Sequence, residues 1–142
     1  MNRRTFALAT SAAAVLPCRG QSDDLPFRAL GACAPLGKAE ACMKGGAEYI
    51  EESVKRLLIP DKPEEMWLAN LEKAKASPLP IAGCNGFLPN TLRCTGKDAV
   101  HDAVLQYAAT AFRRANQLNL DYIVFGSGKA RMLKEGDTLE EA

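Results

Sequence analysis

Three short segments place polar or glycine residues where an apolar, strand-like run ends. Glu51 ends the run at 47–51 and Glu52 follows it, Asn85 follows the run at 79–84, and a Gly-Ser-Gly turn follows the run at 121–125. In parallel α/β folds, functional sites lie at the carboxyl ends of the strands. The sequence therefore indicates a site built around these three segments.

The acidic and amide residues suit the recognition of a polyol. A carboxylate at a strand end can bind sugar hydroxyls, ligate a metal ion or move a proton. Because side chains alternate along a strand, only one of Glu51 and Glu52 is expected to face the site. Asn85 offers both a donor and an acceptor. Two ordinary alternatives stay open, since a strand-end Glu can be a solvated charge and Asn85 followed by Gly86 can be a simple turn.

The segment 126–131 has some features of an anion-binding loop. It does not match the Walker pattern, because Ile123 stands at the first glycine position and Ala130 replaces the Ser or Thr. A glycine turn after a strand can still present backbone N–H groups to an anion. Lys129 and Arg131 could bind a phosphate or carboxylate, or could simply be solvated. A tight connection between elements is the other interpretation of the turn.

Histidine and cysteine chemistry has little support. His101 is the only histidine, and it is expected in a helix with a structural or surface role, so no Ser–His or Cys–His pair is predicted. The five cysteines include no CxxC pair and lack zinc-ligand spacing. We expect Cys33, Cys42 and Cys84 to be small buried hydrophobes.

The elements that must position these residues alternate between strands and helices. Strands are predicted at 27–33, 47–51, 79–84 and 121–125. Helices are predicted at 38–44, from Asp61 to Ser77, from Thr95 or Asp98 to about Leu118, and from Asp137 onward. This alternation is typical of a parallel sheet covered by helices. The pattern itself leaves three possibilities open: part of an eight-fold barrel, an open doubly wound sheet, or a small open-sheet protein complete in itself. No G-x-G-x-x-G follows the first strand, so dinucleotide binding is not favoured.

Two of the predicted helices have an apolar side. The earlier helix is expected to direct Met66, Trp67, Leu71 and Ala74 inward. In the longest helix the apolar stripe consists of Val100, Val104, Tyr107, Ala111, Ala115 and Leu118. Arg113 and Arg114 are expected to fall mostly away from this stripe.

Composition and the N-terminal residues suggest where the protein works. The chain has 142 residues, 47% of them hydrophobic, which is typical of a globular domain. Its net charge of +1 lacks the excess of positive charge that nucleic-acid-binding domains carry. No apolar run reaches the roughly 18–20 residues of a membrane span. Residues 1–24 resemble a twin-arginine export signal, because Arg3 and Arg4 precede an apolar stretch. We therefore expect a bacterial periplasmic protein whose fold occupies residues 25–142.

Three motifs together resemble a known family. Residues 46–51 (GAEYIE), 84–89 (CNGFLP) and 125–131 (FGSGKAR) are similar, in order and spacing, to the sugar phosphate isomerase/epimerase family. That family belongs to the xylose isomerase-like TIM barrels, and some members carry twin-arginine signals. The resemblance runs from about Phe27 to Gly136. It favours the barrel over the open sheet.

The resemblance implies a fold and a set of pocket residues. The fold would be a partial (β/α)8 barrel of about four βα units, with the last helix truncated. A Glu in the position of Glu51 often faces the substrate pocket in this family. The same pocket would be bordered by Asn85, Phe87, Gly126, Ser127 and Gly128.

The resemblance also implies an activity and a cofactor. Members isomerise or epimerise sugars or polyols by proton transfer beside a divalent metal ion. The usual metal ligands come from later strands of the barrel, so we expect this chain to contribute part of a pocket wall, to lack a metal site, and to be inactive alone. The alternative is a non-catalytic sugar-binding module or a half barrel that self-associates through its exposed sheet edges.

Overall fold

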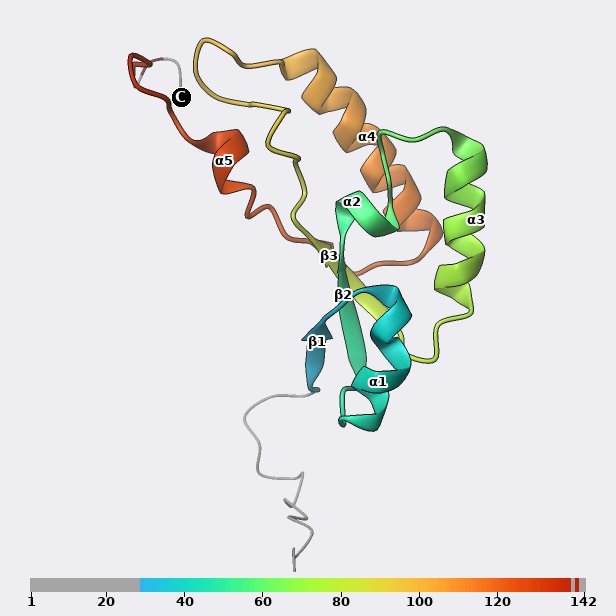
Figure 1. The fold of residues 1–142 in the computed structure, drawn as a ribbon. Helices are drawn as coiled ribbons and strands as arrows, with labels where there is room; N and C mark the ends of the chain where they lie inside the picture. The colour runs from blue at the N-terminus through green and yellow to red at the C-terminus, as the bar shows by residue number, and fades with distance from the viewer. Residues whose placement is uncertain (1–28, 139, 141–142) are drawn as a thin grey trace, which may run out of the picture.

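The computed structural model describes residues 29–138 and 140 of the chain, which form a sheet covered by helices (Figure 1). The strands are β1 (Gly31–Cys33), β2 (Tyr49–Ser53), β3 (Ile81–Asn85) and β4 (Tyr122–Ile123). The helices are α1 (Ala39–Lys44), α2 (Val54–Leu57), α3 (Glu64–Lys75), α4 (His101–Gln117) and α5 (Gly128–Arg131), with a 3-10 turn, η2, at Leu36–Lys38. The predicted export signal lies outside the described residues. None of the helices within them has the length and apolar character to cross a membrane.

All strand pairs are parallel, and each strand pairs with the next strand along the chain. The order is β1-β2-β3-β4, with Cys33 opposite Glu51, Ser53 opposite Asn85, and Gly83 opposite Tyr122. The predicted parallel α/β sheet is therefore confirmed. The strand order contains no reversal, and a reversal is what creates the ligand-binding crevice of a doubly wound sheet.

Several predicted boundaries are wrong for local reasons. The second strand continues to Ser53, and the unpredicted helix α2 follows at once, because Val54 and Leu57 bury their side chains in the core. Helix α4 begins only at His101. Asp98, predicted near its start, instead pairs with Lys134.

The first turn of α3 also differs from the prediction. The helix begins at Glu64 with Pro63 at the N-cap position and no side-chain cap. Asp61, expected to cap it, forms an ion pair with Lys62 at 3.2 Å instead. The acidic residues at the start of α3 still lie where the helix dipole favours negative charge.

The core lies between the sheet and one layer of helices. In Figure 1, α1, α3 and α4 lie on the same side of the strands. Most of the predicted inward residues are buried there: Trp67, Leu71, Ala74, Tyr107, Ala111 and Ala115. Met66 and Val100, also predicted to face inward, are wrong: they are 52% and 40% exposed.

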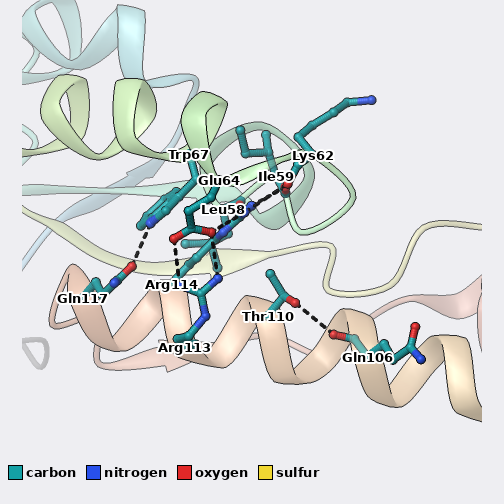
Figure 2. Close-up of polar contacts among 10 residues, drawn as sticks. All are labelled: Leu58, Ile59, Lys62, Glu64, Trp67, Gln106, Thr110, Arg113, Arg114 and Gln117. Atoms are coloured by element: carbon teal, nitrogen blue, oxygen red, sulfur yellow. Dashed lines mark hydrogen bonds and ion pairs between the residues drawn. The ribbon is translucent and has the colours of Figure 1, made fainter.

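Arg114 is the main exception to the predicted pattern, since it is 2% exposed. Its guanidinium donates to the carbonyl oxygens of Leu58 (2.9 Å), Ile59 (2.5 Å) and Lys62 (3.0 Å), and it pairs with Glu64 at 3.0 Å (Figure 2). Ile59 has a φ of 39°, which a β-branched residue rarely adopts. Contacts from outside the loop are therefore needed to hold it, and Arg114 supplies them.

The same arginine joins α3 to α4. Its guanidinium carbon lies 5.4 Å from the centre of the Trp67 ring, a cation–π distance. The Trp67 indole N–H donates to Gln117 Oε1 at 2.7 Å (Figure 2). Arg113 binds Glu64 through both carboxylate oxygens, at 2.9 and 2.8 Å. Hydrogen bonds from Arg113 and then Arg114 lower the pKa of Glu64 to about 2.

Replacing Arg114 should destabilise the fold far more than replacing its neighbour. Arg114→Met removes the cation and leaves the carbonyl oxygens of the loop without their donor, while Glu64 keeps only Arg113, so we expect a loss of about 3–5 kcal/mol in unfolding free energy. Urea denaturation can be followed by fluorescence, because Trp67 is the only tryptophan. Arg113→Met is the matched control, and it should cost much less because that side chain is half exposed. Equal losses in the two variants would contradict this role for Arg114.

Candidate functional site

One face of the sheet carries no helix layer in the described part of the chain. Along β2, Ile50 and Glu52 are buried toward the helices, while Tyr49, Glu51 and Ser53 alternate with them and are only half-buried. We call the face that carries Tyr49, Glu51 and Ser53 the open face. Side chains on neighbouring strands gather there around Glu51.

The Glu51 carboxylate accepts hydrogen bonds from three other strands. Asn85 Nδ2 donates to Oε1 at 2.8 Å, and the Cys33 thiol contacts the same oxygen at 3.4 Å. The Tyr122 hydroxyl donates to Oε2 at 3.2 Å. Because Glu51 and Asn85 are half-buried while Cys33 and Tyr122 are exposed, this cluster is open to a ligand from solution.

Two glycines make room for aromatic rings on this face. A Cβ at Gly31 would lie 2.1 Å from the Tyr49 ring, and a Cβ at Gly83 would lie 2.5 Å from the Tyr122 ring. Real Cβ atoms do not approach that closely, so any larger residue would displace the ring. Sequence reasoning missed Cys33, Tyr122 and both glycines as parts of the site. A glycine inside a strand was the available signal, since it often marks such a close approach.

The Glu51 carboxylate contributes to raising the pKa of two neighbouring groups, the Cys33 thiol and the Tyr122 hydroxyl. The pKa of the Cys33 thiol is raised, chiefly by its hydrogen bond to Glu51 and then by burial and the carboxylate charge. Burial, followed by the hydrogen bond to Glu51, raises the pKa of Tyr122 to about 12. Both groups therefore stay protonated as donors at neutral pH, and Cys33 is a poor nucleophile. The expectation that Cys33 is buried is wrong, whereas Cys84 is buried as predicted.

Glu52, the adjacent carboxylate, has a structural role. Its side chain is 3% exposed and accepts from the Leu36 N–H (2.7 Å), the Ser53 N–H (2.7 Å) and Arg56 Nε (2.9 Å). These contacts tie the loop after β1 to the end of β2. Glu51 and Glu52 point to opposite faces of the sheet, as the alternation of side chains predicts, and Glu51 is the one on the open face.

The other predicted site residues lie apart from the Glu51 cluster. Phe87 is 7% exposed, and its ring packs against Phe112 and Phe125 at centroid distances of 5.3 Å and against Tyr107 at 6.4 Å. This ring belongs to the core, because the loop after β3 turns back toward α4. We therefore exclude Phe87 from the open-face site.

The glycine-containing segment 126–128 also has a structural role. Ser127 Oγ accepts the Leu88 N–H at 2.8 Å, which ties the loop after β4 to the loop after β3. Ser127 has a φ of 21°, and the helix α5 begins at Gly128, so the segment is a helix start rather than a simple turn. A Cβ at Gly126 or Gly128 would meet nothing within 4 Å. His101, at the start of α4, is exposed as expected.

The described residues contain no group of three or more His, Cys, Asp or Glu side chains that could hold a metal ion. On the open face, Glu51 is accompanied by a thiol, an amide and a phenol, a poor match to the several oxygen ligands that Mg²⁺ or Mn²⁺ takes. The divalent metal implied by the resemblance does not fit this cluster. The cluster can instead accept and donate hydrogen bonds beside two aromatic rings.

Comparison of the chain with models of protein families, with curated proteins and with solved structures found no match. The sugar phosphate isomerase/epimerase resemblance therefore stays a prediction.

Removing the Glu51 charge should make Cys33 more reactive. In Glu51→Gln the carboxylate no longer disfavours the thiolate, so the pKa of Cys33 should fall and its alkylation by iodoacetamide at mildly alkaline pH should be several-fold faster. Peptide-resolved mass spectrometry can measure Cys33 with Cys94 as the internal reference. Glu40→Gln, on an exposed glutamate of α1, is the control and should leave both rates unchanged. An unchanged Cys33 rate in Glu51→Gln would contradict the contact.

Proposed function

We propose that the open face binds a sugar or polyol, with Glu51 as the central hydrogen-bond acceptor. The observation that carries this proposal is the convergence of Asn85, Cys33 and Tyr122 on one half-buried carboxylate. A ligand hydroxyl can replace any of these donors at Glu51, and the amide and phenol then hydrogen-bond to further hydroxyls.

The surroundings of the carboxylate support a sugar more than a simple cation. The Tyr49 and Tyr122 rings provide apolar surface that suits the C–H side of a sugar ring, with polar tips in reach of hydroxyls. Cys33 and Asn85 are the last residues of β1 and β3, whereas Glu51 is the middle residue of β2 and Tyr122 the first residue of β4. Two of the four groups therefore lie at the carboxyl ends of their strands, where parallel α/β proteins bind ligands.

We infer further that the sheet is part of a (β/α)8 barrel whose interior is the open face. The unreversed strand order and the single helix layer support this inference, because a barrel adds each strand beside the previous one and keeps its helices outside. In such a barrel Glu51 would line the interior.

The reaction that the resemblance implies is isomerisation or epimerisation by proton transfer at a carbon next to a carbonyl. General-base catalysis needs a carboxylate or similar group within hydrogen-bond reach of the proton that it takes, and Glu51 is a half-buried carboxylate on the open face. Because the metal does not fit the cluster, Glu51 is assigned to ligand binding, with no step at a metal ion. Residues 1–24 are proposed to direct export to the periplasm.

Sugar binding can be tested on the full chain by NMR. Titration with D-xylose, D-fructose or myo-inositol should shift the Asn85 side-chain amide signals, because that amide donates to Glu51. Glu51→Gln should weaken binding by about tenfold or more, as expected for a lost hydrogen bond to a charged group. Glu40→Gln should bind as the wild type does. No shift with any of the three, or equal affinity in Glu51→Gln, would contradict the proposal.

Self-association is a second candidate function, favoured by exposed apolar residues. Leu30 is 51%, Val124 43% and Phe125 47% exposed, next to edge strands β1 and β4. In the described residues each of these strands pairs on one side only, and such edges promote pairing between chains. A second copy could pair β4 with β1 and cover the open face.

Analytical ultracentrifugation tests the pairing of two copies. The wild-type chain should show a dimer that increases with concentration, and Val124→Lys should shift the distribution toward monomer, because an edge charge blocks strand pairing. Lys129→Gln, a change at an exposed position on α5, is the control. A monodisperse wild-type monomer at every concentration would exclude self-association.

A further inference from the structure

A second candidate site lies on the opposite side of the sheet from Glu51. It is a cleft of about 470 Å³ between α4 and the loops that follow α2 and β3, a volume in the range of small-molecule sites. Its polar lining includes Lys55, Asp61, Tyr107 and Thr110, and Pro60 and Leu92 contribute apolar surface. None of these residues belongs to the Glu51 cluster.

The hydroxyl of Tyr107 has no hydrogen-bond partner among the described residues. Tyr107 is 7% exposed, and its ring is held against Phe87. Its hydroxyl is not among the buried polar atoms that lack a partner, so it is accessible from the cleft that Tyr107 lines and can donate to a ligand there. Burial and the negative charge of Asp61 raise the pKa of Tyr107 to about 12, so the hydroxyl remains a donor beside a carboxylate.

The cleft also brings together groups of opposite charge. Lys55 is exposed and forms no ion pair within the part of the chain that the structure describes. Asp61 pairs with Lys62 at 3.2 Å, but both side chains are about half exposed, so that pair contributes little and can be exchanged for a ligand. Thr110 Oγ1 donates to the Gln106 carbonyl oxygen at 3.1 Å and keeps its lone pairs as acceptors.

We propose that this cleft binds a small carboxylate that carries an α-amino or α-hydroxyl group and an apolar side chain. The ligand carboxylate accepts from Lys55 and the Tyr107 hydroxyl. The amino or hydroxyl group donates to Asp61 or Thr110. The apolar side chain packs against Pro60 and Leu92. The ligand carboxylate thereby provides an acceptor for the Tyr107 hydroxyl and Lys55, two lining groups that have no side-chain partner among the described residues.

Three related probes separate the parts of this proposal. L-phenylalanine carries the α-amino group, 3-phenyllactate carries the α-hydroxyl group, and 3-phenylpropionate lacks both. NMR titration of the full chain, read at the Leu92 methyl signals, should show binding of phenylalanine, phenyllactate or both, and clearly weaker binding of phenylpropionate. If phenylalanine binds more tightly than phenyllactate, Asp61 and Thr110 prefer an amino donor; the reverse order indicates a hydroxyl donor. Equal binding of all three would overturn the donor requirement, and binding of none would overturn the site.

Variants test the two residues that hold the carboxylate. Tyr107→Phe removes only the hydroxyl and should weaken binding by about tenfold, and Lys55→Gln should weaken it by a similar factor. Tyr49→Phe, on the open face, is the matched control and should bind as the wild type does. Glu51→Gln should also bind normally, so this result is independent of sugar binding at the open face. Unchanged affinity in Tyr107→Phe would overturn the assignment of the hydroxyl.

Discussion

The two-residue repeat of β2 divides the molecule into a packed side and an open side. Ile50 points into the core, where it is fully buried, and Glu52 points the same way and ties down the loop after β1 through its hydrogen bonds. Glu51, between them, points to the other face. A shift of register by one residue would exchange these roles and bury Glu51 without its partners. The hydrogen bonds of Glu52 and the packing of Ile50 therefore position the candidate site as well as the core.

The coarse fold could be predicted from the sequence because strands and helices have different periods. The alternation of short apolar runs with amphipathic segments correctly indicated a parallel sheet, and three residues of the predicted stripe, Tyr107, Ala111 and Ala115, are buried as the 3.6-residue repeat requires. Arg114 could not be predicted. A cation is normally exposed, and its burial depends on the loop carbonyls of Leu58, Ile59 and Lys62, which lie more than 50 residues earlier in the chain. Such a contact leaves no local pattern.

The site could be predicted only in part, for a related reason. Glu51 and Asn85 were found because strand-end polar residues stand out in the sequence, and the structure places them 2.8 Å apart. Tyr122 looked like an ordinary strand residue, and its role follows from Gly83 on the next strand, which leaves space for the ring. Phe87 was predicted beside Asn85 because the two are close in the sequence, whereas its ring packs against Tyr107, Phe112 and Phe125. Which of these residues lie together depends on how the strands and loops pair in space, and a single sequence carries no information on that pairing.

The central claim is that the strand order β1-β2-β3-β4 brings Glu51, Asn85 and Tyr122 together on one uncovered face. Nuclear Overhauser contacts in the full chain test it most directly. We expect contacts from the Tyr49 ring to the Gly31 α protons, from the Tyr122 ring to the Gly83 α protons, and from the Asn85 side-chain amide to the Glu51 side chain. Absence of these contacts, together with contacts that pair β1 with β3 or β4, would contradict the strand order and with it the site.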